Sequence, residues 1–352
     1  MEQLDIKSLY YHELESVMKE KGLPSFRAKQ IYEWLHRKLV FDYDEMLNLS
    51  KELRAMLKAE YPLVSLSEID SLHSGTDGTI KYLFRLKDNR VIESVLMRYH
   101  HGNSVCISSQ VGCRMGCKFC ASTIGGKERD LLPSEMLDQI YRIQALTGER
   151  VSNVVVMGTG EPLDNYDHLI RFLRILTDEK GLNISARNIT VSTCGIPDRI
   201  QALAKEDMAI TLALSLHAPN NEIRKQLMPV AAKYELNEVM NAFRYYYDMT
   251  GRRLTFEYSL VDGVNDEEEH AKELCHLVRG LNCHINLIPV NPIKERNYRK
   301  SESKKIQIFK NILEKNRINV TIRREMGADI DAACGQLRKS YIDKNSSDDC
   351  HN

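Results

Sequence analysis

The spacing of hydrophobic and polar positions changes twice along the chain. Two stretches near the N-terminus, 10–22 and 27–39, carry helical patterns, and a Gly-Leu-Pro segment stops the first of them. Residues 80–86 and 90–97 are rich in β-forming side chains and are separated by a turn-like Lys-Asp-Asn, which predicts a small hairpin. The chain therefore begins with a helical module and continues into a small β unit.

From residue 104 onward, strand-like runs alternate with helical stretches. One such stretch contains Leu169, Phe172, Leu173 and Leu176, which have the i, i+3, i+4, i+7 spacing of a helix with one buried face. Because a parallel return needs a crossover about as long as a helix, the alternation predicts parallel βαβ units. The strand-like runs are 104–109, 153–158, 188–193, 210–217, 253–260, 284–290 and 319–324.

These patterns predict an α/β fold with a partial (βα) barrel, an N-terminal helical module and a small β extension. We expect four segments with different compositions. They are a helical accessory module at 1–62, a β linker at 63–103, the barrel core at 104–340 and a flexible tail at 341–352.

Composition narrows the functional classes. With 352 residues and 43% hydrophobic content, the chain has the composition of an ordinary globular protein. The 49 basic and 49 acidic residues cancel, so bulk charge does not indicate a nucleic-acid or membrane partner. The N-terminus is acidic and polar, and no run of 18 apolar residues occurs. Nine cysteines, an odd and mostly scattered set, indicate thiols rather than disulfides, so we expect a cytoplasmic protein.

Polar and small residues gather where the predicted strands end. In a (βα) barrel these ends converge on the face that binds ligands. Taken alone, a Gly-x-Gly is weak evidence, and a single histidine such as His217 is more often a satisfied core residue. Cys194, Cys275 and Cys283 are interpreted as structural core positions. The residues that follow the strands are Gly158, Gly160, Glu161, Ser192, Thr193, Cys194, Ser215, His217 and Asn291.

Three cysteines, Cys113, Cys117 and Cys120, form a C-x3-C-x2-C loop with a glycine before the first and before the second. Structural zinc prefers four ligands, usually in two separated pairs, and here only Cys106 could be added to the three. An iron–sulfur cluster held by three thiolates leaves one iron without a protein ligand, and that iron can accept a small molecule. On spacing alone, both a zinc site and an iron–sulfur cluster remain open.

In this setting the cysteine loop resembles that of the radical S-adenosylmethionine (SAM) enzymes. Together with four further motifs it resembles the RlmN/Cfr family of RNA adenosine methyltransferases, and all of these motifs taken together span about residues 93–338. The further motifs are GTGEPLDN, LALSLHAPN, NLIPVNP and GADIDAACGQLR. The resemblance implies a [4Fe-4S] cluster on the three cysteines, and SAM as both methyl donor and radical source. It implies SAM contacts at Gly160, Glu161, Ser192, Ser215, Leu216, His217 and Asn291.

The resemblance also implies three catalytic roles, in a route that methylates C2 of adenosine and consumes two SAM per turnover. Cys334 would carry the methyl group as S-methylcysteine, Cys106 would resolve the protein–RNA bridge through a transient disulfide, and Glu93 would accept the C2 proton. From the residues alone, Cys334 also fits a small buried side chain and Cys106 an inward-facing strand position. Strand alternation could likewise place Glu93 on a solvent face.

The implied partners are 23S rRNA, tRNA and a one-electron donor such as flavodoxin or ferredoxin, with no membrane. We expect a monomer, with the front module as an RNA-binding module. The nearest alternative is Cfr-like methylation of C8, although Pro162 in GTGEPLDN favours the C2 enzymes. An activating enzyme for a glycyl radical would need neither Cys334 nor a basic module, and a zinc-stabilised RNA-binding protein would have no catalysis. Basic clusters that could contact RNA are Arg27, Lys29, Arg37, Lys38, 293–300, Lys304, Lys305 and 337–341.

Overall fold

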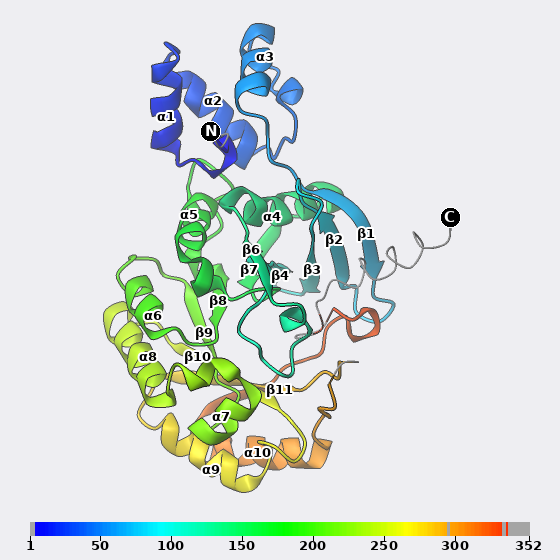
Figure 1. Ribbon diagram of the computed structural model, residues 1–352, viewed down its shortest axis with the longest axis vertical. Coiled ribbons are helices and arrows are strands. Elements are labelled where there is room, and N and C mark those ends of the chain that lie inside the picture. The colour runs from blue at the N-terminus through cyan, green and yellow to red at the C-terminus, as the bar shows by residue number, and fades with distance from the viewer. Residues whose placement is uncertain (1–3, 294–295, 333–335, 337–352) are drawn as a thin grey trace.

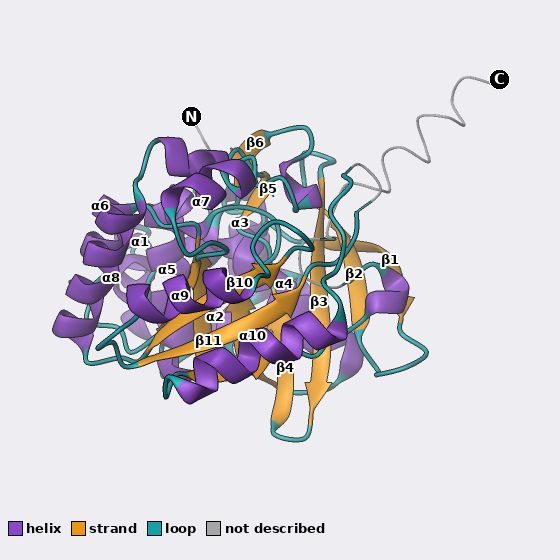
Figure 2. Ribbon diagram, turned by 90° about the horizontal axis from the view of Figure 1, so that it is seen from below, coloured by secondary structure: helices purple, strands orange, loops and turns teal. Residues whose placement is uncertain are grey.

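The computed structural model describes residues 4–293, 296–332 and 336, which form a curved sheet with helices around it (Figures 1 and 2). Within these residues the main sheet has ten strands, in the order β1-β2-β3-β4-β7-β8-β9-β10-β11-β12. The strands are β1 (Ser67–His73), β2 (Ile80–Arg85), β3 (Val91–Tyr99), β4 (Gly102–Cys106), β7 (Val151–Val156), β8 (Ile189–Thr193), β9 (Thr211–Ser215), β10 (Leu254–Leu260), β11 (Cys283–Pro289) and β12 (Asn319–Ile322).

From β4 to β12 every neighbouring pair of strands is parallel. Helices in the connections bring the chain back for each parallel return, as the alternating sequence pattern predicted. In the described part of the chain β1 and β12 are the two edges of an open sheet, so the predicted partial (βα) barrel is confirmed. The helices are α1 (Tyr11–Glu20), α2 (Ser25–His36), α3 (Lys51–Glu60), α4 (Pro133–Thr147), α5 (Tyr166–Thr177), α6 (Pro197–Leu203), α7 (Asn221–Leu227), α8 (Leu236–Thr250), α9 (Glu268–Leu277) and α10 (Ser303–Lys315).

Helix α5 illustrates how the hydrophobic pattern positions these crossover helices. Its predicted stripe of Leu169, Phe172, Leu173 and Leu176 is fully buried in the main hydrophobic core. Side chains three and four positions apart share one face of a helix, so the stripe buries that face against the core. None of the helices among the described residues combines the length and the hydropathy required to cross a bilayer.

The predicted hairpin is part of the same sheet as the barrel. Strand β2 pairs with β3 and β3 with β4, in both cases antiparallel, so the small β unit extends the sheet at its first edge. The sequence pattern did not predict β1, because this edge strand is largely exposed and has no apolar run. It also did not predict the two-stranded ribbon of β5 (Gln110–Gly112) and β6 (Lys127–Asp130). Strands this short have too few residues to show alternation.

The N-terminal helices have a hydrophobic core of their own. Leu14 of α1, Ile31 and Leu35 of α2, and Leu57 of α3 are fully buried in it. This helical unit lies beside α4 and α5 (Figure 1).

A buried ion pair joins the helical unit to the barrel. The Nζ of Lys7 lies 2.7 Å from Oδ1 of Asp138 on α4, and neither side chain is exposed to solvent. Lys7 also donates to the carbonyl oxygen of Val64, at 2.9 Å. The second carboxylate oxygen of Asp138 accepts a hydrogen bond from the backbone N–H of Leu66, at 3.1 Å. Both charges are therefore paired and hydrogen-bonded, as burial requires.

We expect Lys7→Met to lower the free energy of unfolding by about 3–5 kcal/mol, because the carboxylate of Asp138 then stays buried without its cation. Urea denaturation measures the loss. The double variant Lys7→Met/Asp138→Asn should recover part of it, since asparagine is neutral and can still accept from Leu66. As a control, Lys21→Met removes an exposed pair with Glu60 and should cost much less stability, because solvent screens exposed pairs. Equal losses for Lys7→Met and Lys21→Met would contradict this account.

Candidate active site

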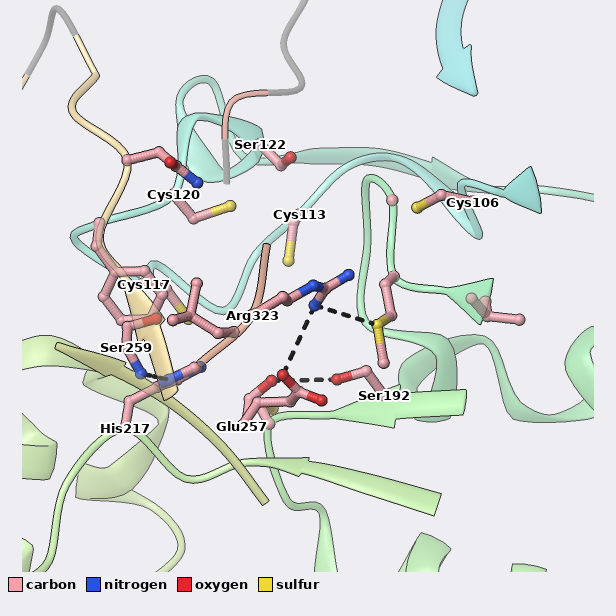
Figure 3. A pocket seen from close by; sticks show the side chains of 18 of the residues that line it. Cys106, Cys113, Cys117, Cys120, Ser122, Ser192, His217, Glu257, Ser259 and Arg323 are labelled. Atoms are coloured by element: carbon pink, nitrogen blue, oxygen red, sulfur yellow. Dashed lines mark hydrogen bonds and ion pairs between the residues drawn. The ribbon is translucent and has the colours of Figure 1, made fainter. Parts of the chain in front are cut away.

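A pocket opens at the carboxyl ends of the parallel strands (Figure 3). Its wall includes the three cysteines of the C-x3-C-x2-C loop and residues from the ends of β4, β7, β8, β9, β10 and β11. It thus lies on the face where a (βα) barrel binds its ligands.

Glycine geometry shapes the cysteine loop where it leaves the β5–β6 ribbon. Gly112 has a φ of +74°, and a Cβ there would lie 1.9 Å from the carbonyl oxygen of Gly126. The next residue, Cys113, donates its backbone N–H to that same oxygen, at 3.1 Å. Only glycine allows this close approach of two backbone segments. Gly116 also has a positive φ, +72°, a backbone conformation that side chains rarely adopt.

The loop turns three thiols into the pocket. Thr123 stabilises the turn, because its hydroxyl donates to the carbonyl oxygens of Cys117 and Cys120, at 3.1 and 2.9 Å. Burial raises the pKa of the Cys113 thiol to about 12 and also raises the pKa of Cys117 and of Cys120. Metals bind the thiolate, so these buried thiols depend on positive charge, such as that of iron, to lose their protons. Three thiolates in one pocket are a donor set suited to an iron–sulfur cluster.

Gly160 and Glu161 follow β7 and lie against the loop before the cysteines. Gly160 has a φ of +115°, and a Cβ there would come within 2.7 Å of Ser109 and Gln110 side-chain atoms. The Glu161 carboxylate accepts the backbone N–H of Leu163, at 3.1 Å, and that of Cys194, at 2.7 Å. Burial raises the pKa of Glu161, and these hydrogen bonds act in the opposite direction. Glu161 thus connects the ends of β7 and β8 in the wall of the pocket.

Serines and a histidine end the next strands. The hydroxyl oxygens of Ser192 on β8 and Ser215 on β9 lie 3.2 Å apart. His217 has a φ of +55°, its ring Nδ1 accepts the backbone N–H of Ser259 at 2.9 Å, and the ring meets Phe119 edge-on. Burial lowers the pKa of His217 to about 3, so the ring is neutral at physiological pH. Of the predicted SAM-binding residues only Leu216 is absent from the pocket wall, because its side chain is buried in the core.

Cys106 ends β4 and is partly buried in the pocket wall, on the other side of the pocket from Cys120 (Figure 3). Cys334 lies outside the described residues. The chain before it packs onto the same region, since Met326 and Ala332 share a hydrophobic cluster with Val95 and Cys106, and Ala332 lines the pocket.

Glu93 is buried in β3, with only 3% of its surface exposed, which excludes the solvent-facing alternative. Its carboxylate lies 3.6 Å from the Nζ of Lys81, which is equally buried. Lys81 also donates to the carbonyl oxygen of Asp331, at 3.1 Å. Glu93 itself is not in the pocket wall, but Val95, two positions further along the same face of β3, is. Lys81 therefore links Glu93 to the chain that leads to Cys334.

Sequence reasoning missed a second buried carboxylate at this pocket. Glu257 of β10 accepts from the side-chain amide of Asn286 at 2.8 Å and lies 3.6 Å from the guanidinium of Arg323. Arg323 also reaches the sulfur of Met157, at 4.0 Å (Figure 3). The signal available in the sequence was a glutamate within the strand-like run 253–260, and the structure buries every position of β10. It is the same signal that singled out Glu93.

The radical SAM superfamily model matches residues 107–275, which include the cysteine loop and the strand ends up to β10. Fold and pocket together define a radical SAM enzyme, a class that uses an iron–sulfur cluster and SAM.

Comparison with whole proteins defines the family. A probable dual-specificity RNA methyltransferase RlmN of Lachnoclostridium phytofermentans is 66% identical over 97% of this chain and 96% of its own length. The corresponding protein of Lachnospira eligens is 64% identical over 96% of this chain and 97% of its own length. A model of the ribosomal RNA large subunit methyltransferase N-terminal domain matches residues 4–62. The chain belongs to the RlmN family of radical SAM RNA methyltransferases.

A solved structure has the same fold over nearly the whole chain. The crystal structure of a radical SAM methyltransferase from Sphaerobacter thermophilus superposes with a TM-score of 0.92 and 44% sequence identity. The match covers 95% of this chain and 99% of the other.

Proposed function

We propose that this enzyme methylates C2 of adenosine in 23S rRNA and in tRNA, through a methylated cysteine. The observation that carries the proposal is that the cysteine loop, Cys106 and the described chain that leads toward Cys334 meet at one pocket. The cysteine loop forms one part of the wall, and Cys106 forms another. Ala332, two residues before Cys334, lies beside Cys106 in the same wall. The names of the close relatives, which are dual-specificity RNA methyltransferases, support both RNA classes as substrates.

A radical route suits the chemistry of this carbon. C2 of adenine is too weakly nucleophilic to take a methyl cation from SAM, and its aryl C–H bond is too strong for hydrogen abstraction. When bound, the cluster and SAM would supply a 5′-deoxyadenosyl radical able to take a hydrogen atom from a cysteine-bound methyl group. We assign the cluster to Cys113, Cys117 and Cys120. The SAM contacts are assigned to Gly160, Glu161, Ser192, Ser215, Leu216, His217 and Asn291.

Three protein side chains carry out the remaining steps. The Cys334 thiolate takes a methyl group from one SAM and, after hydrogen abstraction, presents it to C2 as a carbon radical. Addition to C2, with one electron passed to an external one-electron carrier in its oxidised form, leaves Cys334 joined to the base through a methylene group. Glu93 takes the C2 proton, and the Cys106 thiolate attacks the sulfur of Cys334. A disulfide forms, the carbon–sulfur bond breaks, and the released carbon is protonated to a methyl group. An external thiol must reduce the disulfide before the next turnover.

The rest of the chain would bring RNA and electrons to this pocket. We propose that residues 1–62 form the RNA-binding module, since a family model of this N-terminal domain matches 4–62. An electron donor such as flavodoxin or ferredoxin would reduce the cluster. Both substrates and both donors are components of the cytoplasm, where we expect the enzyme to act as a monomer.

The position of the methyl group tests the proposal. Enzyme reconstituted without oxygen should convert adenosine in RNA to 2-methyladenosine, identified against 2-methyl and 8-methyl standards by chromatography and mass spectrometry. Cys334→Ala should form no methylated product while it still cleaves SAM to methionine. Cys275→Ala, which changes a buried thiol on α9, should retain activity. An 8-methyl product would make the enzyme Cfr-like, and methylation by Cys334→Ala would remove the carrier thiol from the scheme.

A further inference from the structure

One buried cation in this pocket region has no role in the scheme above. Arg224 of α7 has no solvent-exposed surface. Its Nη2 donates to the carbonyl oxygen of Cys194, at 2.5 Å. Its Nε and Nη1 have no hydrogen-bond partner among the described residues. No ion pair between described residues includes Arg224. A guanidinium buried with a single neutral acceptor is rare, because desolvation of an unpaired charge is costly.

Arg224 lies next to the cysteine loop. Helix α7 is tied to that loop, because the backbone N–H of Lys118 donates to the carbonyl oxygen of Leu227, at 2.9 Å. Arg224 lies one turn before Leu227 on that helix, and Lys118 directly follows Cys117, so the guanidinium and the cysteine loop belong to two segments that are bonded together.

The cysteine loop beside Arg224 is suited to hold an assembly with a net negative charge. Three thiolates around a cationic iron–sulfur core carry a net negative charge, and one-electron reduction adds another negative charge. In a poorly solvated interior, a fixed cation beside that assembly stabilises it, and stabilises the reduced form more than the oxidised form. The cost of burying Arg224 alone is then offset when the site is loaded.

We propose that Arg224 is the buried counter-charge of the iron–sulfur cluster and raises the potential at which the cluster accepts its electron. In this step the electron comes from the external donor, and Arg224 neither gains nor loses a proton or a bond. The role is a positioning and electrostatic one and does not depend on which carbon of adenosine is methylated. The competing explanation is that Arg224 only supports the backbone at Cys194.

The reduction potential separates these explanations. Arg224→Met keeps much of the side-chain length without its charge, and Arg224→Lys keeps the charge. We expect at least a tenfold lower equilibrium constant for one-electron reduction in Arg224→Met, equivalent to 59 mV, and a smaller change in Arg224→Lys. Redox titration of the reconstituted proteins, followed by electron paramagnetic resonance, measures it. The control is Arg252→Met, which removes a partly buried guanidinium bonded to Thr211 at the opposite end of the strands. An unchanged potential in Arg224→Met would overturn the proposal.

Thermal unfolding of the metal-free protein gives a second and independent readout. Without the cluster Arg224 is an unpaired buried charge, so metal-free Arg224→Met should unfold at the same temperature as the metal-free parent or at a higher one. With the cluster loaded, the same variant should unfold at a lower temperature than the loaded parent. A purely structural arginine would instead destabilise both forms equally, and that result would also overturn the proposal.

Discussion

Cys106→Ala is expected to leave RNA covalently joined to the protein. In the proposed scheme, the Cys106 thiolate is the group that attacks the sulfur of Cys334 and frees the methylated base. Cys106 ends β4 in the pocket wall and shares a hydrophobic cluster with Ala332, so the chain before Cys334 is within its reach. Alanine keeps the packing but removes the nucleophile. Turnover should therefore stop at the bridged species, with at most one methylene transferred per protein.

A denaturing gel with labelled RNA measures the adduct, and mass spectrometry after nuclease digestion locates it on Cys334. The double variant Cys106→Ala/Cys334→Ala should form no adduct, because the carrier is missing. Cys275→Ala, a buried cysteine on another helix, should behave as the parent. Release of free, fully methylated RNA by Cys106→Ala would remove Cys106 from the mechanism.

Glu93→Gln is expected to slow methylation by about 10²–10⁴-fold, the usual contribution of a general base. Glutamine preserves the size of the side chain and can still hydrogen-bond but cannot take the C2 proton. The buried Lys81, 3.6 Å away, holds the carboxylate in place. Formation of the RNA adduct should persist in Glu93→Gln, since addition to C2 precedes proton removal in the scheme.

RNA with deuterium at C2 of the target adenosine makes this test specific. The parent enzyme should release the label, whereas the adduct formed by Glu93→Gln should retain it. Glu257→Gln is the matched comparison, because Glu257 is also a buried carboxylate and lines the pocket. If Glu257→Gln retained the deuterium and Glu93→Gln released it, Glu257 would be the base.

The elements that sequence alone predicted are those whose signals are local. The apolar runs of β2 and β3 and the stripe on α5 appear as predicted, because side-chain period and burial are read within one segment. The cysteine loop is equally local, with three thiols and two glycines within a few residues. Strand β1 escaped prediction because an exposed edge strand needs no apolar pattern.

The sequence predicted those residues of the candidate site that follow parallel strands, because the ends of such strands converge. Gly160, Ser192 and Asn291 lie in the wall of one pocket, as expected of residues that follow parallel strands. Leu216 shows the limit of this reasoning, because its side chain is in the core. Glu257 was missed because a charged residue in an apolar segment does not reveal its partner. Arg224 was missed because α7 is a largely polar helix, in which an arginine is expected to face solvent.

The sequence by itself therefore determined the alternation of strands and helices, and the set of thiols available to hold a cluster. Only the tertiary structure decided which buried charges meet. Lys7 pairs with Asp138, 131 positions away, and Lys81 bonds the backbone of Asp331, 250 positions away. Arg224 is brought to the cysteine loop by helix α7. A hydrophobic period is a property of one segment, whereas the energy of a buried charge depends on whichever segments the fold packs around it.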